Sequence, residues 1–468
     1  MLLMLVIAAA VGAVWGSVLL KKTGLLGGCL AVMLVGSCFG YAYYHVDVGG
    51  FSVTADRVLL ALLAVAFVIM GRLGLTERRQ LDKLDITLLL FMGVLVFSML
   101  SHSWKPSILA SLLVFNLMAG AIYWLARGAV FSERAVLGMF AAIAGFGLYL
   151  AVTSILEQQQ MLAFVYPRYI ATSTFTEFLG RGRGPLLNPA SNGLFLGAGW
   201  FCMLMFWPRV NHKGKLLLVA LSVIFGGGVI CTMTRCVWMA VLLGLLILIV
   251  TNLPRRWATL FAAAVVLVGC IGIAAKWNDL QAFKRDKDVS VADMSKSAGL
   301  RPIFAVIAWH MFLEQPILGC GYGQYPVESK YYLSDRSTQL RLEKARIYVQ
   351  HNVVLSLLTE TGLVGSGLFV LLMLLWFQSG WCTWTDRQTP LIYRQQGLIM
   401  VTVLTVYLVI GMFQDLTIAW MANQLIFFMA GVSRGLRDHC FPVVATKQYA
   451  ADSRLVATCS ALVVPHKS

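Results

Sequence analysis

Long apolar runs recur along the whole chain and constrain its fold more than any motif does. A helix that crosses a bilayer needs roughly 20 largely apolar residues. The 468-residue chain is 59% hydrophobic and 12% charged, which is more apolar sequence than a soluble core can absorb. About thirteen stretches are long enough to span by that measure: residues 2–20, 24–44, 57–71, 85–101, 107–126, 135–155, 191–208, 215–231, 236–252, 257–275, 352–378, 396–413 and 416–433.

The fold class follows from the need to satisfy backbone hydrogen bonds inside the lipid bilayer. Every backbone polar group must be hydrogen-bonded within the spanning structure, and long unbroken apolar runs favour helices over barrel strands. We therefore predict an all-α, polytopic integral membrane protein with about 12–13 transmembrane helices. It divides into transmembrane helices 1–10 with short loops over 1–275, a large outer loop with an amphipathic helix over 276–350, transmembrane helices 11–13 over 351–435, and a cytoplasmic tail over 436–468.

Lysine and arginine are concentrated in alternate short loops, which predicts the orientation. Cytoplasmic loops retain these residues. We therefore place in the cytoplasm the loops near residues 21–22, 72–83, 127–134, 209–215, 255–256 and 387–394. The loops near 45–56, 102–106, 156–190, 232–235, 276–350 and 414–415 then lie on the outer side, together with the amino terminus. The first apolar stretch either crosses the membrane or lies at its surface; it lacks a preceding basic region and is not predicted to be a cleaved signal peptide.

Composition argues against several classes of partner and cofactor. The net charge of +16 is mostly explained by the cytoplasmic basic loops, so nucleic acid is not predicted as a partner. The ten cysteines lie largely within apolar runs and indicate no disulfide framework, although Cys231 and Cys236 flank one short outer turn. The sequence has no CxxC or HExxH motif and its seven histidines are scattered, so it indicates no metal site, and no cofactor is predicted. Asp286-Lys287-Asp288 resembles a metal-binding DxD motif, but it lies in a basic stretch and is interpreted as solvated charge.

Arginines on the predicted outer side are candidates for binding an anionic group. Arg235 follows Thr234 at the outer start of the ninth span, and an arginine at membrane depth is costly unless it meets an anion. Its alternative role is to reach phospholipid head groups. Arg301 precedes Pro302, which fits the first turn of a helix, and is otherwise a solvated loop arginine. Arg181 and Arg183 alternate with glycines and would suit phosphate oxygens, or form a plain positively charged loop.

His351 lies where the large outer loop gives way to an apolar run. The adjoining helix N-terminus would disfavour the imidazolium, leaving a neutral imidazole able to accept a proton. The alternative is a structural hydrogen-bond donor. Glu360 falls inside the apolar run, where we expect it to pair with an arginine or with backbone donors.

Four segments in fixed order resemble the O-antigen ligase and polymerase family. They are Gly299-Leu300-Arg301, Pro316-Ile317-Leu318-Gly319-Cys320-Gly321, Gln350-His351-Asn352, and Thr359-Glu360-Thr361-Gly362-Leu363-Val364-Gly365. Members of that family are bacterial membrane glycosyltransferases of GT-C-like fold that act at the outer, periplasmic face of the inner membrane. They use glycans carried on undecaprenyl diphosphate. The chain differs from the commoner twelve-span plan by its first apolar stretch.

The resemblance implies a role for each candidate residue. His351 corresponds to the catalytic histidine, and Arg235 and Arg301 to the arginines that bind the lipid diphosphate. Arg181 and Arg183 are a looser match. The implied partners are a lipid-linked glycan donor, a glycan, lipid-core or protein acceptor, and membrane lipids, with metal-independent transfer as the reaction. A flippase or transporter of lipid-linked glycans is the alternative, but the two halves show no repeat and the candidate residues cluster at one interface.

Overall fold

The computed structural model describes residues 2–48, 51–76, 80–102, 105–172, 178–254, 256–260, 263–264, 267, 291–335, 340–345 and 351–440. Its long helices are α1 (Leu2–Phe39), α2 (Ala55–Arg72), α3 (Lys83–Leu100), α5 (Met118–Arg127), α6 (Glu133–Gln158), α7 (Pro189–Leu204), α8 (His212–Cys231), α9 (Arg235–Asn252), α12 (Val291–Glu314), α14 (Val353–Thr385), α15 (Leu391–Gly411) and α16 (Trp420–Cys440).

Short elements join these helices. They are α4 (Pro106–Leu112), α13 (Tyr325–Glu328), the π-helical turn η1 (Leu113–Leu117), and the 3-10 turns η2 (Leu162–Phe164), η3 (Arg168–Ala171), η4 (Gly184–Leu186), η5 (Trp207–Arg209), η6 (Ser329–Tyr332) and η7 (Leu342–Ala345). Strands β1 (Val46–Val48) and β2 (Phe51–Val53) form one antiparallel hairpin, with Asp47 opposite Ser52.

The all-α polytopic prediction is confirmed. Nine helices in the described residues are long and apolar enough to cross a membrane, judged by length and composition. Helices α2 and α16 lie at two further predicted positions, but each carries three charged residues. Helix α1 is interrupted at Gly24, close to the predicted boundary between the first two stretches. Most of the predicted span 257–275 and the tail beyond Cys440 lie outside the described residues.

Asparagine and aspartate residues set the starts of several helices. Asn188, Asn211 and Asn352 each accept a hydrogen bond from a backbone N–H in the first turn of α7, α8 and α14. Asp82 and Asp85 form a reciprocal capping box at the start of α3. Such caps satisfy N–H groups that have no partner within the helix, and each contributes about 1 kcal/mol.

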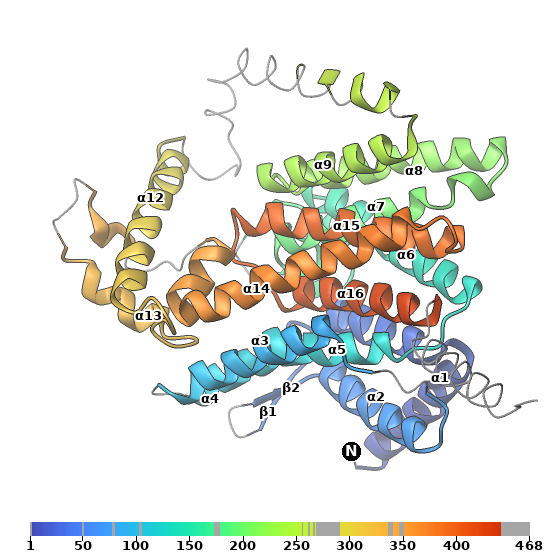
Figure 1. Ribbon diagram of the computed structural model, residues 1–468, viewed down its shortest axis with the longest axis horizontal. Coiled ribbons are helices and arrows are strands. Elements are labelled where there is room, and N and C mark those ends of the chain that lie inside the picture. Colours follow the sequence, from blue (N-terminus) through green and yellow to red (C-terminus); the bar gives the residue numbers. More distant parts are fainter. Residues whose placement is uncertain are drawn as a thin grey trace, which may run out of the picture.

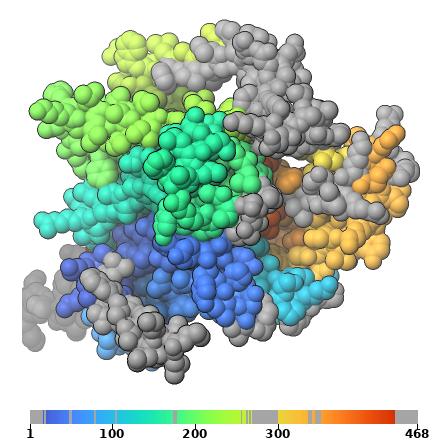
Figure 2. Space-filling model, turned by 180° about the vertical axis from the view of Figure 1, so that it is seen from behind, coloured from blue at the N-terminus to red at the C-terminus, as the bar shows by residue number. Residues whose placement is uncertain are grey.

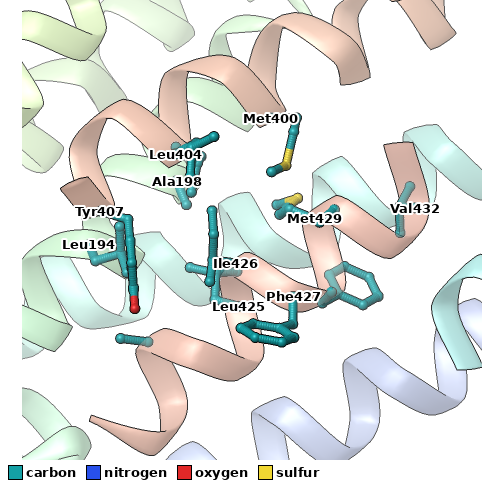
Figure 3. Close-up of a cluster of buried hydrophobic side chains, with 14 of the residues drawn as sticks. Leu194, Ala198, Met400, Leu404, Tyr407, Leu425, Ile426, Phe427, Met429 and Val432 are labelled. Carbon is teal, nitrogen blue, oxygen red and sulfur yellow. The ribbon is translucent and has the colours of Figure 1, made fainter. Parts of the chain in front are cut away.

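The centre of the bundle is an apolar cluster shared by α7, α15 and α16. Helices α14, α15 and α16 run side by side, with α9 packed on α15 and α5 packed on α16 (Figure 1). Figure 3 shows Leu194 and Ala198 of α7 grouped with Leu404 and Tyr407 of α15 and with side chains of α16. From behind, the blue-green chain that joins α6 to α8 lies over the middle of the molecule, above the blue N-terminal helices (Figure 2).

A buried ionic cluster joins three helices at the end of the bundle predicted to face the cytoplasm. Arg127 of α5 is 2% exposed and forms ion pairs with Asp85 of α3 and with Asp438 of α16, the latter at 2.9 Å. Tyr123 donates a hydrogen bond of 2.9 Å to Asp85. Paired charges at this depth hold the helices in register, because removing one partner leaves the others buried without compensation.

Helices α12 and α13 stand across the opposite end of the bundle, where α14 begins (Figure 1). They have a small core of their own, in which Ile303, Ile307 and Met311 of α12 pack with Tyr325 and Leu342. Helix α12 therefore lies within the segment predicted to be the large outer loop. The prediction that Pro302 lies in its first turn is wrong, because α12 begins at Val291 and contains Pro302 within it.

Candidate functional site

A break in α14 receives the glycine-rich turn of the large loop. Gly362 has φ 60° and ψ −158°, so the helix cannot continue its own hydrogen bonds there. The N–H groups of Leu363 and Val364 bond instead to the carbonyl oxygens of Pro316 and Ile317, at 2.8 and 3.2 Å. The loop therefore supplies acceptors for donors that the break leaves without helical partners.

The same turn returns two donors to the other side of the break. The N–H groups of Cys320 and Gly321 bond to the carbonyl oxygens of Thr359 and Glu360, at 2.8 and 3.2 Å. These are the carbonyls that Leu363 and Val364 would bind in an unbroken helix. We call these four bonds, between residues 316–321 and 359–364, the clasp.

Two glycines allow the clasp to close. A Cβ atom at Gly319, where φ is 71°, would lie 2.6 Å from the backbone of Thr359 and Glu360. A Cβ atom at Gly362 would lie 2.4 Å from the backbone carbonyl of Ile317. Both positions therefore need glycine, for the left-handed φ and for the close approach of backbone to backbone. Two of the four segments that carry the family resemblance, 316–321 and 359–365, are thus two halves of one structural unit.

Glu360 has the backbone partners expected of a carboxylate in an apolar run. The N–H groups of Gly323 and Tyr325 bond to its carboxylate. Its carbonyl oxygen accepts a hydrogen bond of 3.0 Å from the hydroxyl of Ser98, which in turn accepts one from the N–H of Tyr322. The expectation of backbone donors is confirmed, and these bonds fix the direction in which the carboxylate points.

His351 lies directly before the cap of α14. Asn352 accepts hydrogen bonds from the N–H groups of Val354 and Leu355, at 2.8 and 3.1 Å, and donates one of 2.9 Å to the carbonyl of Met412 at the end of α15. The exposed imidazole is therefore presented at a helix N-terminus that is tied to the neighbouring helix. The edge-on ring of Phe304 from α12, with centroids 5.6 Å apart, packs against the imidazole.

Arg301 lies one turn before Phe304 on the same helix. Its exposed guanidinium stacks over the ring of Phe413, 5.2 Å from the centroid, immediately after the Met412 carbonyl that Asn352 binds. Helix α12, the end of α15 and the start of α14 therefore bring Arg301 and His351 to one region.

Arg235 is the first residue of α9 and is exposed. The positive charges of Arg301 and Arg181 both act on the thiol of its neighbour Cys236, so the start of α9 belongs to the same region as Arg301. Cys231 and Cys236 are free thiols in the structure. Arg235 and Arg301 are thus both exposed, and the helix N-terminus at Arg235 adds a preference for anions.

Arg181 and Arg183 lie instead in the protein interior, 3% and 0% exposed. Arg181 donates hydrogen bonds to the hydroxyl of Thr234 at 2.5 Å and to the carbonyl of Thr232 at 3.3 Å, and so fixes the turn that leads into α9. Arg183 donates to the carbonyl of Ile170 at 2.8 Å, and its Nε lies 3.7 Å from Oε1 of Glu157. Both guanidinium groups are occupied by protein partners.

A cavity of about 310 Å³ contains His351 on its wall. Asn188 and Ser191, at the start of α7, line the same cavity, so the chain that follows Arg183 does reach the histidine. Asp415 also lines this cavity, and sequence reasoning missed it. The available signal was its position, as the single acidic residue between Asp386 and Asp438 and in a predicted outer loop of two residues.

Asp415 is held in one orientation by its neighbours. Its Oδ1 accepts hydrogen bonds from the N–H and the hydroxyl of Thr417, at 3.0 and 2.5 Å. Burial raises the pKa of this carboxyl, while hydrogen bonds from Thr417 and Ser356 act in the opposite direction. An oriented carboxylate therefore shares a cavity with the imidazole.

The described part of the chain offers no cluster of metal-binding side chains. No group of three or more histidine, cysteine, aspartate or glutamate side chains is placed there to hold an ion. Asp286-Lys287-Asp288 lies outside the described residues.

Part of the chain is similar to a known family. Residues 217–370 match the family described as O-antigen ligase. This segment is similar to an O-antigen ligase domain. No curated protein matches it. The matched segment contains Arg235, Arg301, His351 and both halves of the clasp, whereas Arg181, Arg183 and Asp415 lie outside it. The match, together with the long apolar helices, supports a multi-pass membrane protein that transfers glycan in surface polysaccharide assembly.

Proposed function

We propose that the chain transfers or polymerises glycan from undecaprenyl diphosphate onto an acceptor hydroxyl, at the outer face of the bacterial inner membrane and without a metal ion. The observation that carries the proposal is the placement of an exposed histidine at a helix N-terminus, with Arg301 on the helix that packs against it. One group suited to accept a proton and one suited to bind an anion converge on the same interface.

His351 acts on the acceptor in this reaction. The acceptor oxygen forms a bond to the anomeric carbon as the bond from that carbon to the diphosphate oxygen breaks, and the hydroxyl proton passes to the imidazole. The N-terminal end of α14 disfavours the imidazolium before reaction, so the ring is neutral and able to accept. General-base assistance of this kind contributes roughly 10²–10⁴-fold in rate.

Arg301 and Arg235 stabilise the leaving diphosphate. Negative charge grows on its oxygens as the glycosidic bond breaks, and guanidinium groups can bind those oxygens in pairs. Both side chains are exposed, and they project from α12 and α9 into the same region. This is the role that a divalent metal has in many other glycosyltransferases, which is why we propose transfer without one.

Arg181 and Arg183 support the same site from within the protein. Arg181 donates a hydrogen bond to Thr234, the residue before Arg235. Arg183 pairs with Glu157 and precedes the segment whose residues Asn188 and Ser191 line the His351 cavity. Direct binding of the diphosphate by either residue stays a prediction, and the observed partners favour a positioning role.

Cells that lack the protein provide the test. They are complemented with the wild type, with His351→Ala, or with His310→Ala at matched membrane abundance. His310 is the control because it also lies in the outer region but pairs with Asp335, at 3.1 Å. We expect His351→Ala alone to lose polymer or ligated glycan and to accumulate the lipid-linked precursor on the outer leaflet. Precursor retained on the inner leaflet, or full rescue by His351→Ala, would instead indicate a transporter.

The purified enzyme tests the absence of a metal. Transfer in detergent should persist after treatment with EDTA. Activity that is lost with EDTA and restored by Mn²⁺ would contradict this part of the proposal.

A further inference from the structure

A second cavity, of about 220 Å³, lies beside the one that contains His351. It is bounded by α4, η1, the end of the glycine-rich turn, α14 and the loop between α15 and α16. Its polar wall consists of Ser107, Ser111, Ser356, Glu360, Asp415 and Thr417. The arginines of the proposed diphosphate site are absent from this wall.

The two cavities adjoin. Asp415 and Ile418 line both of them, so the second cavity and the cavity that contains His351 share part of a wall. Any group bound in the second cavity is therefore close to the proposed general base. The second cavity also borders the clasp, because the clasp residue Glu360 forms part of its wall.

The two carboxylates in this wall are oriented before any ligand binds. Backbone N–H groups of Gly323 and Tyr325 hold Glu360, and Thr417 holds Asp415. The two carboxyl groups are also close enough to act on each other. Carboxyl groups act solely as acceptors of hydrogen bonds when they are ionised, and in that state this wall selects a ligand that donates them. Neighbouring hydroxyl groups of a sugar fit this requirement, and a carboxylated or phosphorylated sugar does not.

We propose that this second cavity binds the terminal sugar of the acceptor glycan through its hydroxyl groups and directs the attacking hydroxyl towards His351. The inference rests on the proposed function, and it names the acceptor class as a sugar end that is uncharged or carries an amino group. Opposite charges then separate the substrates, because the arginines attract the diphosphate of the donor while Glu360 and Asp415 repel it.

Two soluble or dispersible probes test the two sides of the site separately. Methyl glycosides of neutral hexoses and of 2-acetamido hexoses report on the second cavity, and undecaprenyl diphosphate without sugar reports on the arginines. Binding of each is measured on the full-length protein in nanodiscs, by saturation-transfer NMR and by equilibrium binding respectively. Ser111→Phe fills the second cavity, whereas Ala110→Phe changes a neighbouring residue of α4 that does not line it.

The proposal expects Ser111→Phe to weaken glycoside binding at least about tenfold while undecaprenyl diphosphate binding stays within about twofold of wild type. Ala110→Phe should change neither, and Arg301→Ala should show the converse pattern. The proposal is overturned if Ser111→Phe leaves glycoside binding unchanged, if methyl glucuronide binds as well as the neutral glycosides, or if glycoside binding requires Ca²⁺. Glycoside binding needs no catalysis, so this result is independent of the His351→Ala test of the proposed function.

Glu360→Gln provides a second variant that keeps the shape of the wall. It removes one negative charge and retains an oxygen that can accept from Gly323 and Tyr325. We expect the variant to accept methyl glucuronide at least about tenfold better than wild type does. An unchanged preference between neutral and acidic glycosides would show that this carboxylate does not select the acceptor.

Discussion

Replacing Gly362 with alanine is expected to detach the glycine-rich turn from α14. The residue has φ 60°, and an added Cβ would lie 2.4 Å from the carbonyl of Ile317. The obstructing atoms are backbone, so they can withdraw only if the turn itself moves. The bonds from Leu363 and Val364 to that turn are then lost first.

The size of the effect follows from these contacts. A left-handed φ costs an L-residue about 1–2 kcal/mol. Two backbone hydrogen bonds, at about 0.5–1.5 kcal/mol each, add about 1–3 kcal/mol. The clasp should therefore weaken by about 2–5 kcal/mol, which raises the population of the detached turn about 30-fold to about 4,000-fold.

Cys320 reports this opening directly. It is 6% exposed, and its N–H forms one of the clasp bonds. In a variant with Cys320 as its sole cysteine, we expect Gly362→Ala to accelerate labelling by a membrane-impermeant maleimide at least about 30-fold. Gly367→Ala is the matched control, because it lies on the same helix and a Cβ there meets nothing within 4 Å. Labelling rates of the two variants within about threefold of each other would refute the reasoning.

Three further predictions concern other parts of the structure. Arg127→Met should destabilise the protein by about 3–5 kcal/mol, measured by unfolding in detergent, because the fully buried Asp85 loses its cation, whereas the partly exposed Asp438 keeps Arg434. A loss below about 1 kcal/mol would contradict this. Asn352→Ala should cost about 1 kcal/mol of helix capping and reduce glycan transfer, whereas Asn352→Asp keeps the cap and loses only the donor to α15. Thr417→Val should raise the pKa of Asp415 further, because it removes a hydrogen bond that favours the ionised carboxylate. The acidic limb of the pH–rate profile for transfer should then move to higher pH, whereas Thr417→Ser should retain the wild-type profile.

The long helices could be predicted because the signal that specifies them is local. Apolar runs of bilayer length, with basic residues in alternate loops, gave positions close to those of α3, α6, α8 and α9. The start of α14 just after His351 also agrees with the predicted boundary between the large outer loop and the apolar run.

The remaining features depend on contacts between distant segments. Nothing local in the sequence shows that the turn at Gly319 replaces the hydrogen bonds that α14 loses at Gly362. The burial of Arg181 could not be predicted, because its partner Thr234 lies 53 residues further along the chain. Asp415 was overlooked because a single acidic residue in a two-residue loop has meaning only once the cavity walls around it are known.

The clasp also offers a route to engineering. Its four bonds use backbone atoms alone, so the attachment does not depend on which side chains the turn carries, apart from the glycines at its closest approach. Tyr322, whose hydroxyl accepts a hydrogen bond from Asn116, lines the second cavity from within that turn. A library varied at Tyr322, with the glycines kept, would therefore change the lining of the cavity while keeping the four backbone hydrogen bonds of the clasp. The backbone of this turn thus holds it to α14, while one of its side chains lines the cavity.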